Sequence, residues 1–131
     1  MSTENNLELL YDDSVQILTD LIAFKTISGE DNSLLIDYCD DILKKLGAIS
    51  FRTYDNEKKR VNLFATLKAK NSSNKKPIIL SGHTDVVPVS KGWSSDPFTA
   101  TIKGNKLYGR GSCDMKGFIA CALAYAPIYS K

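Results

Sequence analysis

Apolar side chains recur at helical spacing through the first 46 residues, in two separate segments. Residues 7–24 form the first segment, and their spacing predicts an amphipathic helix. The polar stretch at residues 28–33 interrupts the pattern and offers capping groups for a second helix. We expect that helix to end near Leu46, because the following Gly47 favours a helix C-terminus.

After Gly47 the apolar positions occur in the short runs that are typical of strands. Two hairpins are predicted, one pairing residues 48–54 with 61–67 and one pairing residues 99–102 with 106–108. The second hairpin has Gly104-Asn105 at its turn, which favours a tight connection. Residues 68–76 predict a flexible loop. The next run, Pro77–Leu80, lacks polar alternation and therefore predicts a strand buried on both faces of a sheet.

The last predicted helix begins near Met115 and is apolar on almost every side. Its residues 120–126 are small or apolar, so we expect several neighbours to cover it, and Pro127 should kink or end it. In a β-α-β arrangement another strand would follow this helix. The pattern therefore predicts an α/β fold with a mixed β-sheet and packed helices, in which residues 1–131 form a single, incomplete domain.

Length and composition fit one globular domain and argue against several classes of partner. The chain has 131 residues, of which 43% are hydrophobic and 24% are charged, and its net charge is +2. The lysine runs at residues 57–60 and 68–76 have no interleaved aromatic side chains, so no nucleic-acid partner is expected. No stretch reads as a membrane span or a signal peptide, so no membrane partner is expected either.

The three cysteines, Cys39, Cys113 and Cys121, are odd in number and form no CxxC pair. Without a secretion signal, we expect reduced thiols and a cytoplasmic location. Cys113 stands beside Asp114, but a nucleophilic thiolate needs a base, and His83 is the only histidine in the chain.

Three polar side chains are predicted to lie in loops after strands: His83, Asp85 and Asp114. Such loops commonly present binding groups in α/β proteins, and imidazole and carboxylate groups are ligands for zinc or cobalt. Asp85 could orient the His83 ring through its second nitrogen. Each residue also has a structural alternative, since a lone histidine is commonly incidental and Asp114 could equally cap the helix that follows. Two ligands alone are too few for a catalytic zinc site, which uses three protein groups and a water.

Four further side chains near these motifs have ordinary structural interpretations. We expect Trp93 and Phe98 to pack in the core or in a pocket wall. Arg110 and Lys116 could attract an anionic substrate, or could form surface ion pairs or interact with a helix end.

Several motifs taken together resemble the M20 family of dinuclear metallo-amidohydrolases and peptidases. They are residues 80–88 (LSGHTDVVP), 93–98 (WSSDPF) and 107–117 (LYGRGSCDMKG). Within that family the chain looks most like the acetylornithine deacetylases, supported by residues 62–66 (NLFAT) and 113–118 (CDMKGF). The succinyl-diaminopimelate desuccinylases and other M20 peptidases share the metal motifs and are the alternatives. The resemblance covers nearly the whole chain, which corresponds to the first part of a typical member.

The resemblance implies a role for each candidate residue. His83 would bind one metal ion, Asp114 would bridge two, and Asp85 would act in catalysis by orienting His83. It also implies zinc or cobalt as cofactor and hydrolysis of a small N-acyl amino acid such as N2-acetylornithine, in arginine biosynthesis. The family's general-base glutamate, its other metal ligands, its lid domain and its C-terminal part have no counterpart among these motifs.

We therefore expect residues 1–131 to be the first part of a dinuclear-zinc-peptidase-like catalytic domain, truncated, with weak metal binding or none and no activity alone. The alternative from a different class is a non-catalytic, truncated product. Such a chain would associate with itself as a homo-oligomer through uncovered apolar faces and strand edges.

Overall fold

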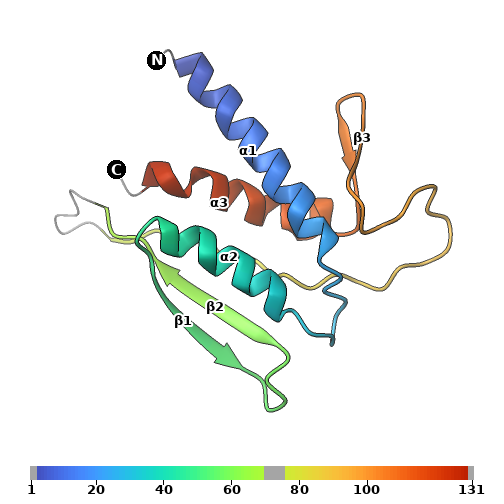
Figure 1. Ribbon diagram of the computed structural model, residues 1–131, viewed down its shortest axis with the longest axis horizontal. Coiled ribbons are helices and arrows are strands. Elements are labelled where there is room, and N and C mark those ends of the chain that lie inside the picture. The colour runs from blue at the N-terminus through green and yellow to red at the C-terminus, as the bar shows by residue number, and fades with distance from the viewer. Residues whose placement is uncertain (1–2, 70–75, 130–131) are drawn as a thin grey trace.

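Three helices and two antiparallel hairpins make up the computed structural model, which describes residues 3–69 and 76–129 (Figure 1). The helices are α1 (Thr3–Ala23), α2 (Ser33–Lys45) and α3 (Gly117–Tyr129). The strands are β1 (Ile49–Tyr54), β2 (Val61–Thr66), β3 (Thr101–Lys103) and β4 (Lys106–Tyr108), and a short turn of helix, η1 (Ser112–Lys116), precedes α3. The α/β class predicted from the sequence is confirmed.

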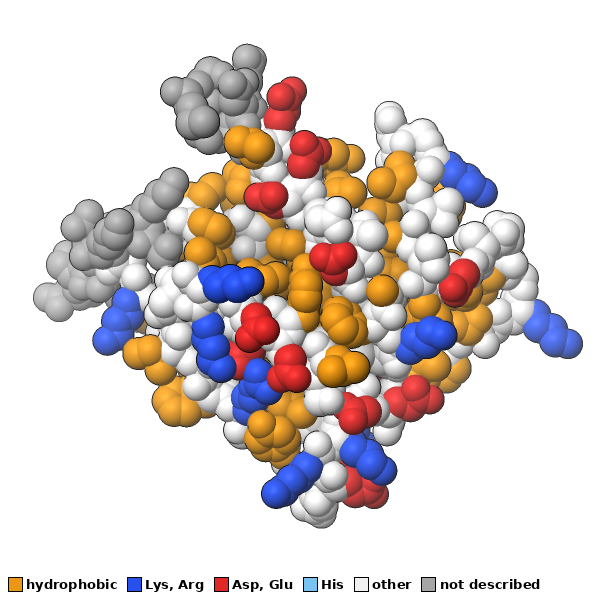
Figure 2. Space-filling model, viewed as in Figure 1, with side chains coloured by type: hydrophobic (Ala, Val, Ile, Leu, Met, Phe, Trp, Pro, Cys, Tyr) orange, Lys and Arg blue, Asp and Glu red, His pale blue; other side chains and the backbone are white. Residues whose placement is uncertain are grey.

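Helix α3 lies between α1 and α2 and contacts both (Figure 1). This position accounts for the buried side chains of α3, Ala120, Leu123, Ala124 and Ala126, whereas Phe118, Cys121 and Ile128 are exposed. The hydrophobic core joins the three helices to β2 and consists of Leu21, Leu35, Ile36, Cys39, Val61, Ala120 and Leu123. Figure 2 shows apolar side chains along the middle of the face between α1 and α2, with charged side chains of both signs around them. Pro127 does not end α3, which continues to Tyr129.

Both predicted hairpins form. In the first, β1 and β2 pair from Ile49–Thr66 to Tyr54–Val61, and the inner face of β1 lies against α2. Arg52 on that face forms an ion pair with the buried Asp40 of α2 at 2.5 Å. In the second, the turn between β3 and β4 uses Gly104 at a φ of +58°, as the sequence predicted.

The strand predicted at Pro77–Leu80 is wrong. Ile78 and Ile79 are 89% and 73% exposed, and the run has no regular secondary structure. A strand needs a hydrogen-bonded neighbour, and no described residue pairs with this run. The described strands accordingly form two separate two-stranded sheets, and the only parallel pairing in this part of the chain is the isolated bridge between Ile27 and Val86.

The remaining expectations concern loops, cysteines and helix length. Residues 70–75 of the predicted lysine-rich loop lie outside the described residues. The three cysteines are free thiols, as expected, with Cys39 buried and the other two exposed. None of the described helices combines the length and the apolar character that crossing a membrane requires.

Candidate metal centre

The loop that carries His83 is fixed by hydrogen bonds to the segment between α1 and α2. Val86 N donates to Thr26 O at 2.8 Å, and Ser28 N donates to Val86 O at 2.9 Å. The Thr26 hydroxyl adds a hydrogen bond to Thr84 O at 2.6 Å. These bonds set the path of the loop backbone, while the His83 side chain remains 49% exposed.

The turn η1, which carries Asp114, is anchored by a buried lysine. Lys116 has no exposed surface, and its Nζ donates to Leu21 O at 2.8 Å and to Phe24 O at 2.7 Å. These carbonyls lie at the end of α1, where a cation is favourable, and each also accepts from one backbone amide: Leu21 O from Phe24 N, and Phe24 O from Thr26 N. Burial lowers the pKa of Lys116 to about 8. Attraction of a substrate and a surface ion pair are therefore wrong for Lys116, whereas the expected interaction with a helix end is formed, at the end of α1.

The two loops bring His83 and Asp114 into direct contact. His83 Nε2 lies 3.0 Å from Asp114 Oδ1, although 31 positions separate the residues in the chain. On the other side of the ring, Nδ1 lies 3.1 Å from the carbonyl oxygen of Asp85 and 3.2 Å from its Oδ1. The structure thus gathers all three candidate residues at one place.

Both ring nitrogens of His83 face oxygen acceptors. Burial acts to lower the pKa of His83, but the Asp85 carbonyl and the Asp114 carboxylate outweigh it and raise that pKa above its ordinary value. A ring with acceptors on both sides is suited to donate from both nitrogens. The pKa of Asp85 is lowered, chiefly because the Ser28 hydroxyl donates to its carboxylate.

The chemistry of His83 and Asp114 fits a divalent metal ion, since imidazole nitrogen and carboxylate oxygen are the donors that zinc and cobalt take. The alternative role of Asp114 as a helix cap is not realised: its side chain is 86% exposed and hydrogen-bonds to His83. Within the described parts of the chain, no group of three or more His, Cys, Asp or Glu side chains is placed to hold a metal ion. The pair therefore fits as two ligands of a site that needs further donors.

Ser28 belongs to this arrangement and was missed in the sequence. Its hydroxyl donates to Asp85 Oδ2 at 2.5 Å, while Asp85 Oδ1 faces His83. Ser28, Asp85, His83 and Asp114 thus form a continuous hydrogen-bonded series. In the sequence, Ser28 reads as part of a helix-capping stretch, and 57 positions separate it from Asp85. The pairing of Ile27 with Val86, together with the hydrogen bonds of Thr26 to this loop, brings the two together.

The two loops touch at Gly111, just before η1. Its φ is +80°, a conformation that favours glycine. A Cβ atom at this position would lie 2.5 Å from Val86 Cγ1, so the close approach of the loops also requires glycine.

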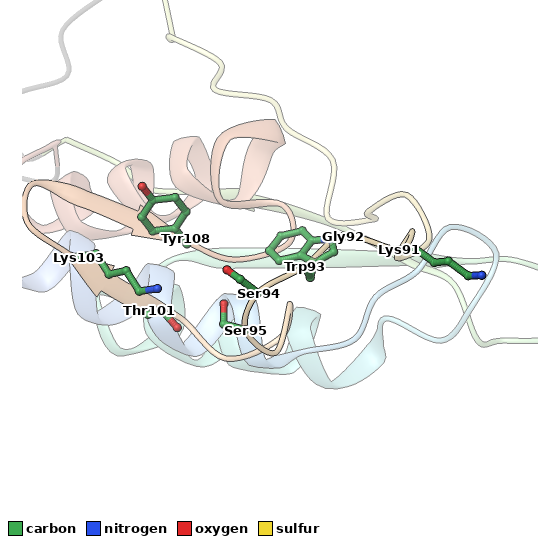
Figure 3. Close-up of a pocket in the computed structure, with 8 residues that line it drawn as sticks. All are labelled: Lys91, Gly92, Trp93, Ser94, Ser95, Thr101, Lys103 and Tyr108. Carbon is green, nitrogen blue, oxygen red and sulfur yellow. The ribbon is translucent and has the colours of Figure 1, made fainter.

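Trp93, Phe98 and Arg110 lie outside the hydrogen-bonded series. Trp93 and Phe98 are partly buried, as their predicted packing role requires. The guanidinium of Arg110 lies 5.2 Å from the centre of the Trp93 ring and also donates to Pro88 O. A cavity of about 410 Å³ lies between residues 91–95 and the hairpin β3–β4 (Figure 3). Trp93 lines it, and neither His83 nor Asp114 does.

Comparison with known proteins identifies the family. Residues 79–131, which include both loops of the site, match the family model described as peptidase family M20/M25/M40. Acetylornithine deacetylase from Myxococcus xanthus is 41% identical over 109 residues, which are 81% of this chain and 28% of the relative. The chain belongs to peptidase family M20/M25/M40. Succinyl-diaminopimelate desuccinylase from Rickettsia canadensis (strain McKiel) is 43% identical over 122 residues, 86% of this chain and 29% of the relative.

A solved structure supports the same fold for this M20 chain. The crystal structure of human carnosine dipeptidase 1 matches with a TM-score of 0.74 at 24% identity, over 95% of this chain and 30% of that chain. At this identity the match shows the fold alone. The chain spans 28–29% of the length of the two relatives named above, so it corresponds to less than a third of each.

Proposed function

We propose that this chain supplies His83 Nε2 and Asp114 as ligands to the metal centre of an amide hydrolase, with Asp85 orienting His83. The observation that carries the proposal is the 3.0 Å contact between Nε2 and Oδ1, made by two loops that separate contacts hold in place. Membership of the M20/M25/M40 family supports a hydrolase. The names of the relatives support a small N-acyl amino acid as substrate, with an acetyl or a succinyl group to be removed.

Zinc or cobalt, when bound, supplies a Lewis acid that polarises an amide carbonyl and makes water more acidic. The residues of this chain would position the metal ion. The Asp85 carbonyl oxygen accepts a hydrogen bond from Nδ1–H of His83, which leaves the lone pair of Nε2 free to bind the ion. Ser28 holds the other oxygen of the Asp85 carboxylate. Asp114, the more exposed ligand, presents two oxygens and is proposed to bridge two ions.

Cobalt binding tests the ligand assignment directly. We expect the 131-residue chain to bind Co²⁺ weakly, because the described residues supply two ligands only. His83→Ala and Asp114→Ala should each abolish the binding measured by calorimetry and by Co²⁺ absorbance. Asp12→Ala, an exposed position on α1, is the control and should bind as the wild type does. Wild-type affinity in His83→Ala would contradict the assignment.

Substrate is tested with chimeras of two relatives. The matching N-terminal region of the Myxococcus xanthus deacetylase, or of the Rickettsia canadensis desuccinylase, is replaced by this chain. We expect acetate or succinate release from at least one chimera, and loss of that release with His83→Ala. The chain alone should release neither, since no described glutamate side chain contacts His83 or Asp114 to act as a base. Turnover by the chain alone would contradict this part of the proposal.

We also propose that the isolated chain associates with itself and that its compartment is the cytoplasm. Self-association is supported by the apolar side chains of Ile78, Ile79, Phe51 and Phe64, which are between 59% and 89% exposed. Sedimentation velocity should show a dimer or larger species that Ile78→Lys with Ile79→Lys converts to monomer. A monomer at high concentration would contradict the proposed self-association.

The proposed cytoplasmic location is supported by the three unpaired cysteine thiols.

A further inference from the structure

The cavity between residues 91–95 and the hairpin β3–β4 has a distinctive chemistry. Two lysines, three hydroxyl side chains and two aromatic rings line it, and no Asp or Glu is among its lining residues. Its volume of about 410 Å³ lies within the usual range for small-molecule sites. The cavity is therefore positive and rich in donors along one side, with the rings of Trp93 and Tyr108 as apolar walls.

Most donors around the cavity are free to meet a ligand, whereas the Thr101 hydroxyl already donates to Thr99 O at 3.4 Å. Neither lysine, Lys91 or Lys103, has a carboxylate within ion-pair distance among the described residues, and the hydroxyls of Ser94 and Ser95 have no hydrogen-bond partner there. The nearest acid along the chain, Asp96, is engaged in its own turn. One of its oxygens accepts from Phe98 N and the other from the Thr99 hydroxyl.

The two lysines that line the cavity differ in direction. Figure 3 shows the Lys103 ammonium pointing toward Thr101 and the hydroxyls of Ser94 and Ser95, whereas Lys91 points away from them. Lys103 and Thr101 lie on β3, two positions apart, so both project from the same side of the strand. One ammonium and three hydroxyls thus face a shared space beside the Trp93 ring.

We propose that this cavity binds a small molecule carrying an oxyanion, a phosphate or a carboxylate, with Lys103 as its principal ionic contact. The hydroxyls of Ser94 and Ser95 donate to the oxyanion, and Trp93 covers the apolar part of the molecule. The site requires neither His83 nor Asp114, so it stands independently of the proposed metal centre.

The chain provides a specific reporter, because Trp93 is its only tryptophan. Fluorescence of the full 131-residue chain is titrated with phenyl phosphate, benzoate, inorganic phosphate and acetate, at constant ionic strength kept with chloride. We expect a saturable change with the aromatic anions that is weaker with inorganic phosphate or acetate. The stronger of the two aromatic anions identifies phosphate or carboxylate as the preferred group.

Lys103→Met should weaken the binding of the preferred anion about tenfold, because it removes a charge-assisted hydrogen bond. Lys106→Met is the matched control: Lys106 pairs with Lys103 across the hairpin but does not line the cavity. It should leave the affinity within twofold of wild type, because an exposed lysine outside the cavity makes no direct contact with the anion. Circular dichroism confirms that both variants fold, and amide shifts of Thr101 and Ser95 provide a second readout.

Three results would overturn the proposal. The first is a response that does not saturate, or that chloride reproduces. The second is equal affinity in wild type and Lys103→Met by both fluorescence and amide shifts. The third is binding lost in Arg110→Met but kept in Lys103→Met, which would place the anion on the Arg110 guanidinium behind the Trp93 ring.

Discussion

The His83 loop and the Asp114 turn meet at one contact but are held by different means. The His83 loop is fixed by backbone pairing with residues 26–28, which adds hydrogen bonds and buries Val86. The turn η1 is fixed by one side chain, Lys116, which reaches through the interior to the end of α1. Both anchors therefore lead back to the same short stretch of chain at the C-terminal end of α1.

This difference indicates that one anchor contributes mainly to the stability of the fold and the other mainly to the geometry of the site. Lys116 is buried and satisfies two carbonyls of a helix that carries part of the core, so its loss should affect the whole fold. Ser28 and Asp85 are largely exposed, so their loss should affect the orientation of His83 and little else. Substitutions at the two anchors can separate these effects.

The largest effect is expected for Lys116→Met, which keeps the length of the side chain and removes its donor. Two carbonyls at the end of α1 would lose their charged donor and keep only the backbone donors Phe24 N and Thr26 N, so we expect the free energy of unfolding to fall by about 2–3 kcal/mol. Urea denaturation followed by circular dichroism measures this change. Lys106→Met on the exposed hairpin is the control and should change stability by less than ~0.5 kcal/mol. Equal stability in both variants would show that the buried lysine does not anchor η1.

Asp85→Asn should have its main effect on the proposed metal site. The amide cannot provide the same charged acceptor for Nδ1, and loss of such an orienting group typically lowers metal affinity about 10–100-fold. Co²⁺ titration measures the loss, with Asp12→Asn as the control on exposed α1. The free energy of unfolding should change little, because Asp85 is 53% exposed. A large loss of stability at unchanged Co²⁺ affinity would show that Asp85 stabilises the fold and does not orient His83.

The smallest effect is expected for Ser28→Ala, which acts on His83 through Asp85. Because His83 is the only histidine, its ring nitrogens give unambiguous ¹⁵N signals, which report the balance of protonated forms at fixed pH. We expect a measurable shift in that balance, and stability within ~0.5 kcal/mol of wild type. Ser14→Ala removes a comparable hydroxyl that bonds to Leu10 O within α1, and it should leave the signals unchanged. Unchanged signals in Ser28→Ala as well would show that Ser28 does not position Asp85.

The sequence predicted the elements that depend on nearby residues. The helix over residues 7–24, the helix that follows the capping stretch and ends near Leu46, and the two hairpins follow from spacing, capping residues and turns, all of which act over a few positions. The run Pro77–Leu80 has the composition of a buried strand, yet it is exposed. Composition expresses a preference for burial, but a strand also requires a neighbouring strand, which no local pattern can supply.

In the candidate site, too, some residues could be predicted from the sequence and others only from tertiary contacts. His83, Asp85 and Asp114 could be selected because their residue types suit a metal ion and their motifs resemble a family. Ser28 and Lys116 could not, since their partners lie 57 and up to 95 positions away. A serine in a polar stretch and a lysine in a glycine-rich motif have many ordinary uses. Only tertiary contact shows that one supports a carboxylate and the other a helix end.

Gly111 has a consequence for how such a site could be retuned. Its missing side chain lets Val86 approach, and Val86 is the residue that pairs with Ile27. An added methyl group at 111 would press on Val86, and a smaller residue at 86 would relieve that contact but not the strain of a side chain at a φ of +80°. Changing the separation of imidazole and carboxylate from position 111 would therefore cost backbone strain. A change at Val86 alone would alter the packing between the loops without that cost.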